Sequence, residues 1–155
     1  MKFESHIVKF RNLDAALQRL DPRADCELWI WTAMNAGVHL LNATLHRAGA
    51  TRETDSFHTQ VEGLYAVPER DAGNMTDVIH PPGDVMHVGQ PPIEAPLSAA
   101  VEKACAALKI IEDLREPHVR GSEPVAADAA QAWQRAYREC VGGLQAALAA
   151  PGSGR

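Results

Sequence analysis

The sequence predicts an all-α protein, an antiparallel helical bundle of about four main helices with a long proline-rich loop between the second and third long helices. In its last third the chain repeats apolar residues at alternating steps of three and four, the pattern of antiparallel bundle helices. Alanine is abundant and aromatic residues make up only 5% of the chain, so closely packed helices are favoured over sheets. We therefore expect a single helical domain over residues 1–150, followed by a flexible tail over residues 151–155.

Size, charge and cysteine content exclude several classes of protein. With 155 residues, of which 46% are hydrophobic, the chain is long enough to bury a core without disulfides or metals. Acidic residues outnumber basic ones by 20 to 15, so we expect no nucleic-acid partner. The N-terminus lacks the apolar run of a signal peptide, and the three cysteines form no CxxC pair. These observations predict a cytoplasmic protein with reduced thiols.

The first twenty residues are predicted to form two separate pieces. Residues 1–10 alternate weakly between apolar and polar side chains and are expected to be an extended arm. Asn12 is a suitable N-cap for a short helix over residues 13–20, whose leucines lie on one face. Asp21 and Pro22 then interrupt the chain.

The second helix is predicted over about residues 24–48, with Gly49 as its C-terminal stop. The 19 residues between Glu27 and Arg47 carry no charge, which raises the question of a membrane span. However, this stretch contains two asparagines, two histidines, two threonines and a glycine, which suit a membrane span poorly. We therefore predict a buried central helix and no membrane partner.

Residues 51–96 show sequence patterns of two kinds, one typical of a helix and one typical of a loop. Residues 51–65 carry an apolar rhythm that predicts another helical segment. Residues 67–96 contain six of the ten prolines and are expected to be irregular. Because this loop is also rich in valine, isoleucine and methionine, we expect it to pack onto the body of the protein or onto a partner chain. Two long amphipathic helices, over about residues 97–116 and after Pro124, then close the domain.

One face of the second helix carries a stripe of uncharged polar residues. At 100° per residue, Asn35, His39, Asn42 and His46 fall within a narrow sector. A face exposed to water normally shows lysine, glutamate and arginine, whereas asparagine and histidine suit a half-buried groove or a subunit interface. Neighbours in the stripe are three or four residues apart, so their side chains can form hydrogen bonds. A structural role and a ligand site are therefore both open interpretations of the stripe.

The spacing of the stripe argues against a metal ion held by this helix alone. His39 and His46 are seven residues apart, about 10.5 Å along a helix axis, whereas two ligands of one ion on a helix are usually three or four residues apart. Asn42, which lies between them, is a weak ligand for a transition metal. We therefore assign no metal ligands.

The proline-rich loop contains two further histidines in a short repeat. Asp77-Val78-Ile79-His80 is followed by Asp84-Val85-Met86-His87. Paired aspartate and histidine residues can orient an imidazole or bind a metal, although chance repetition is the simpler explanation. If the loop folds over the second helix, His80 or His87 would meet His39 or His46 and complete a site.

Three functions are compatible with these features. The first is a small-ligand-binding bundle with an Asn/His-lined pocket and, if it is an enzyme, histidine acid–base chemistry. The second is a non-catalytic module that uses the stripe and the 67–96 loop as an interface, for instance in a homodimer. The third is a metal-dependent bundle with histidine ligands from the second helix and the loop. The sequence shows no glycine-rich phosphate loop, so the identity of any cofactor is unknown.

Overall fold

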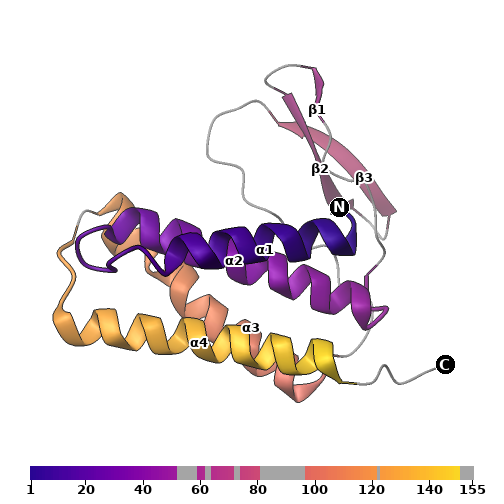
Figure 1. Cartoon of the computed structure of the whole chain (residues 1–155). Coiled ribbons are helices and arrows are strands. Elements are labelled where there is room, and N and C mark those ends of the chain that lie inside the picture. Colours follow the sequence, from indigo (N-terminus) through magenta and orange to yellow (C-terminus); the bar gives the residue numbers. More distant parts are fainter. Residues whose placement is uncertain (52–58, 62–63, 72–73, 81–96, 122, 151–155) are drawn as a thin grey trace.

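The protein folds into a bundle of α-helices, as the sequence predicts (Figure 1). The structure is a computed structural model and describes residues 1–51, 59–61, 64–71, 74–80, 97–121 and 123–150. Four α-helices lie within these ranges: α1 (Phe3–Leu17), α2 (Cys26–Arg47), α3 (Ala99–Asp113) and α4 (Ala127–Ala149). Helices α1 and α2 form one antiparallel hairpin, and α3 and α4 form a second one.

Helix α2 is the centre of the bundle. It contacts α1, α3 and α4, and it has buried residues on every side, among them Ile30 and Leu45. This position explains the absence of charge between Glu27 and Arg47, because a charged side chain there would have to leave water. None of the helices in the described part of the chain combines the length and hydropathy needed to cross a membrane. The prediction of a buried central helix is therefore confirmed.

The prediction for the N-terminal residues was wrong. Instead of an extended arm followed by a short helix, residues 3–17 form the single helix α1. His6, Phe10 and Leu17 are all buried and recur at steps of four and seven, which places them on one helical face. Val8 is 54% exposed, so the alternation seen in the sequence did not mark a buried strand face. The buried face of α1 packs along α2.

The second hairpin packs against α2 through small residues and an aromatic cluster. The side-chain oxygen of Ser98 accepts a hydrogen bond from the backbone N–H of Val101 and caps α3. A π-helical turn, η1 (Arg115–Arg120), leads from α3 toward α4. Across the α2–α4 contact, the Trp29 ring centroid lies 6.3 Å from that of Trp133 and 6.4 Å from that of Tyr137. Both predicted C-terminal helices are therefore present, with α3 somewhat shorter than expected.

The described part of the segment between α2 and α3 contains strands. β1 (Thr59–Val61), β2 (Leu64–Asp71) and β3 (Asn74–His80) form an antiparallel sheet in the order β1-β2-β3. The helix predicted over residues 51–65 was therefore wrong in its described part, and the first half of the expected irregular region contains a paired hairpin. Its register aligns Val67 with Val78, and such β-branched residues favour strands by their backbone preference without producing a helical periodicity.

Two glycines differ sharply in what surrounds them. A Cβ atom at Gly37, on buried α2, would lie 2.5 Å from Cδ1 of Leu108 on α3. A Cβ atom at Gly142, on α4, would meet no atom within 4 Å. Gly37 therefore permits the close approach of α2 and α3, whereas Gly142 has no such role within the described bundle.

We predict that alanine at these two positions changes stability in opposite directions. Gly37→Ala should lower the free energy of unfolding by about 1–2 kcal/mol, because overpacking against Leu108 outweighs the better helix propensity of alanine. Gly142→Ala should raise it by about 0.5–1 kcal/mol, because only the propensity changes. Urea denaturation of both variants tests the pair. A Gly37→Ala variant as stable as Gly142→Ala would show that Leu108 moves aside at no cost.

Candidate functional site

Three histidines from two helices meet inside the bundle, and we call them the histidine cluster: His6, His39 and His46. The antiparallel α1–α2 hairpin places the start of α1 beside the C-terminal half of α2. The Nδ1 atoms of His6 and His39 are 2.9 Å apart and share a hydrogen bond. The ring centroid of His6 lies 5.1 Å from that of His39 and 5.4 Å from that of His46. His6 therefore bridges two histidines that are too far apart on α2 to meet directly.

The three histidines of the cluster are buried to different extents. His6 is 3% exposed and His39 is 4% exposed, whereas His46 is half-buried. Thr51 lies just beyond α2, and its side-chain oxygen is 2.8 Å from Nδ1 of His46. The other ring nitrogen of His46, Nε2, is buried and has no hydrogen-bond partner among the described residues. A buried nitrogen without a partner costs about 1–3 kcal/mol, so this atom is a candidate contact for a ligand.

Burial keeps the paired imidazoles neutral. Burial, followed by the nearby His39, His46, N-terminal amine and Lys9, lowers the pKa of His6 from 6.5 to about 3. Burial and then Lys9 lower the pKa of His39 from 6.5 to about 4. At neutral pH both rings are therefore uncharged, and one donates its Nδ1–H to the Nδ1 lone pair of the other. The ring that donates keeps a lone pair on its Nε2, and the ring that accepts carries its proton there.

The two asparagines of the predicted stripe lie on the same face of α2 but differ in surroundings. Asn42 is 1% exposed and lies between His39 and His46 along the helix. Asn35 is half-buried and donates a hydrogen bond from its side-chain amide to the backbone carbonyl of Trp31, one turn earlier. The buried part of the stripe is therefore the half that runs from His39 toward His46.

The two loop histidines proposed from sequence are not brought to the cluster by any described contact. His80 is the last residue of β3, where it pairs with Tyr65 of β2. His87 lies outside the described residues. A site that combines either of them with α2 therefore remains a prediction.

No metal site emerges from the described residues. Within the ranges that the structure covers, no group of three or more histidine, cysteine, aspartate or glutamate side chains has the arrangement needed to hold a metal ion. In the histidine cluster, the Nδ1 atoms of His6 and His39 face one another and are engaged in their own hydrogen bond. A metal would have to break that bond before using either Nδ1 atom as a ligand.

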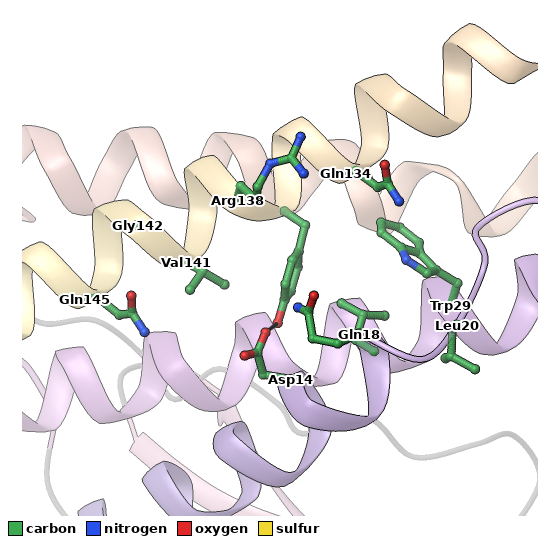
Figure 2. Close-up of a pocket in the computed structure, with 11 residues that line it drawn as sticks. Asp14, Gln18, Leu20, Trp29, Gln134, Arg138, Val141, Gly142 and Gln145 are labelled. Atoms are coloured by element: carbon green, nitrogen blue, oxygen red, sulfur yellow. Dashed lines mark hydrogen bonds between the residues drawn. The ribbon is translucent and has the colours of Figure 1, made fainter.

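A separate cavity of about 380 Å³ lies between α1 and α4, and Trp29 of α2 also lines it (Figure 2). The Tyr137 hydroxyl donates a 2.8 Å hydrogen bond to Asp14 across it. Burial, then this hydrogen bond and the charge of Asp14, raises the pKa of Tyr137, so the hydroxyl remains a donor. Gly142 opens one wall, and the side chain of Gln18 lies beside the Tyr137–Asp14 pair. No residue proposed from sequence lines this cavity.

Sequence reasoning missed His6, the residue that joins the cluster together. The signal was present, since His6 lies four residues before Phe10 and eleven before Leu17, on the buried face of α1. It was lost because residues 1–10 were interpreted as an extended arm. The chain matches no known protein family, and neither a characterised protein nor a solved structure shows significant similarity to it. The functional argument therefore rests on the geometry of the site.

Proposed function

We propose that the protein binds a small molecule at the histidine cluster and that the histidines exchange a proton with it. The observation that supports this most directly is the buried hydrogen bond between Nδ1 of His6 and Nδ1 of His39, near Nε2 of His46, which has no hydrogen-bond partner among the described residues. Apolar side chains would pack such an interior without leaving a polar atom unsatisfied. Features that lower stability, such as a buried polar atom without a partner, are found most often at functional sites.

The cluster is suited to proton exchange because its rings carry both a hydrogen-bond donor and hydrogen-bond acceptors. The paired rings together carry one N–H and one lone pair at their Nε2 atoms, and Nε2 of His46 lies in the same cluster. A ligand that carries both a donor and an acceptor can therefore be matched at the cluster. His46 is the half-buried member of the cluster. Both rings of the His6–His39 pair are neutral at neutral pH, so a lone pair on one of these rings is a candidate to accept a proton from a bound molecule, as a general base does.

Two small probes of nearly equal shape, acetate and acetamide, test this proposal. Histidine ring resonances would be followed by NMR at pH 6.5 while each probe is titrated to high millimolar concentration, with sodium chloride at matched ionic strength as control. We expect at least one probe to shift the resonances of His6, His39 and His46 together. If neither probe moves any of the three, the proposed binding function is wrong.

Two matched variants separate a ligand site from other roles of the same residues. His46→Leu should abolish the probe-induced shifts while leaving the molecular mass in solution unchanged. His118→Leu, which removes a histidine on η1 that packs on Trp133, should leave them intact. A dimer that dissociates on His46→Leu would instead identify the cluster as a subunit interface. Stoichiometric metal in protein purified without a histidine tag would overturn the proposal in favour of a metal centre.

A further inference from the structure

We infer that the cavity between α1 and α4 binds a small organic amine in its cationic form, with Asp14 as the residue that receives the ammonium group (Figure 2). This site is separate from the histidine cluster and independent of the function proposed there. Three features of the cavity support it: the way the helices leave it open, the hydrogen bond that crosses it, and the chemistry of the side chains that line it.

The cavity exists because α1 and α4, both described over their whole length, pack on α2 but not on one another. Its volume of about 380 Å³ falls in the range of small-molecule pockets. Leu17 and Trp29 line it and are buried. Gln18 and Gln145 also line it but are exposed, so they lie at its rim. A molecule can therefore enter from solvent and bury an apolar part against Leu17 and Trp29.

The hydrogen bond between Tyr137 and Asp14 determines which kind of group the cavity can receive. The Tyr137 hydroxyl donates its only proton to Oδ1 of Asp14 at 2.8 Å. Within the described part of the chain, Oδ2 of Asp14 accepts no hydrogen bond, and it is not among the buried atoms that lack a partner. Asp14 is half-buried, so Oδ2 can be reached from solvent. The pair therefore offers a negative charge and acceptor lone pairs, and the ligand must supply the donor.

The other side chains of the cavity favour a cation with an apolar body. Among the described residues that line it, Asp14 alone is acidic, and the ring centroids of Trp29 and Tyr137 lie 6.4 Å apart beside it. Aromatic rings attract organic cations. Arg138 also lines the cavity but is exposed, where salt screens its charge. A primary ammonium on a short aromatic body matches these features, because it brings three donors for the oxygens and a ring for the apolar wall.

Three probes of nearly equal size test the ligand class: benzylamine, benzyl alcohol and benzoate. At pH 7 the first is a cation, the second is neutral and the third is an anion. NMR would follow the indole N–H resonance of Trp29 while each probe is titrated into the full-length protein at constant ionic strength. We expect benzylamine to bind about tenfold more tightly than benzyl alcohol, because only the amine forms a charge-assisted hydrogen bond, and we expect no binding of benzoate.

Asp14→Asn and Glu139→Gln form a matched pair of variants, because each removes one negative charge and keeps the shape of the side chain. Asp14 lines the cavity, whereas Glu139 is exposed on α4 and does not. Asp14→Asn should weaken benzylamine binding about tenfold and leave the affinity for benzyl alcohol within about twofold. Glu139→Gln should change neither affinity.

A third variant tests the location of the site without touching Asp14. Gly142 lines the cavity, and a Cβ atom there would meet no atom within 4 Å, so a larger side chain can be added without disturbing the packed core. Gly142→Leu should therefore weaken the binding of both benzylamine and benzyl alcohol, because leucine occupies part of the cavity. Unchanged binding of both probes in this variant would show that they bind elsewhere and would overturn the inference.

The remaining outcomes are equally decisive. Failure of benzylamine to bind, or tighter binding of benzyl alcohol or benzoate, would overturn the inference. An equal loss of benzylamine affinity in Asp14→Asn and Glu139→Gln would do the same, because the effect would then come from net charge alone. None of these results changes the outcome of the acetate and acetamide titrations at the histidine cluster, so the inference and the proposed function can fail separately.

Discussion

Acidification should unfold this protein well before His6 and His39 are protonated in the folded state. The unfolded chain binds protons at His6 and His39 near pH 6.5, whereas the folded chain does so only near pH 3 and pH 4. Between these limits the unfolded state holds more protons, so the free energy of unfolding falls as pH falls. Each proton contributes up to about 1.4 kcal/mol per pH unit. The loss from pH 6.5 to pH 4 is thus several kcal/mol, a large part of the roughly 5–15 kcal/mol that stabilises a typical domain.

The pH dependence can be assigned to the cluster by removing it. Urea denaturation at intervals between pH 7.5 and pH 4.5 should give a steep decline for the wild-type protein and a much flatter profile for the double variant His6→Leu/His39→Leu. Asp21 does not contribute to the decline in stability between pH 7.5 and pH 4.5. Backbone N–H groups of Ala24 and Arg23 lower its pKa from 3.8, so its contribution is lost only at more acidic pH. A steep decline that persists in the double variant would show that other groups cause the acid sensitivity.

The sequence predicted the helices where composition and periodicity agree. The uncharged stretch between Glu27 and Arg47 marked α2 as central, and the three-and-four repeats marked α3 and α4. Helix α1 was missed because Val8 is an apolar residue on the exposed face of the helix. Its position produced the alternation of apolar and polar residues that is typical of a strand. The strands β2 and β3 were missed because pairing between distant residues, such as Val67 with Val78, leaves no trace in a helical period.

The histidine cluster, too, was predicted only where its residues are close together in the sequence. The stripe on α2 was visible because its residues are three or four positions apart on one helix. His6 was not, because its contact with His39 spans 33 residues and depends on how α1 packs along α2. A hydrogen-bonding seam can therefore be predicted from one helix, whereas its partner on a second helix requires knowledge of how the two helices pack.

Removing one member of the histidine pair should cost more than removing both. In His39→Leu, the Nδ1 atom of His6 stays buried and loses its partner, so we expect a loss of about 2–3 kcal/mol at pH 7.5. His6→Leu leaves His39 in the same condition. In the double variant no unsatisfied nitrogen remains at this contact, and two leucines fill the space. The double variant should therefore lose less than either single variant, which corresponds to a coupling of more than about 2 kcal/mol in the double-mutant cycle.

The cycle also decides between a structural and a functional reason for the pair. If the two changes simply add, the rings do not share the hydrogen bond on which the site is built. If the double variant is as stable as the wild type or more stable, leucines would serve the core equally well, as they do in other proteins when a buried polar group is replaced. The histidines would then have no structural justification. Their presence at a position where they also make the fold sensitive to acid would then argue for a chemical role.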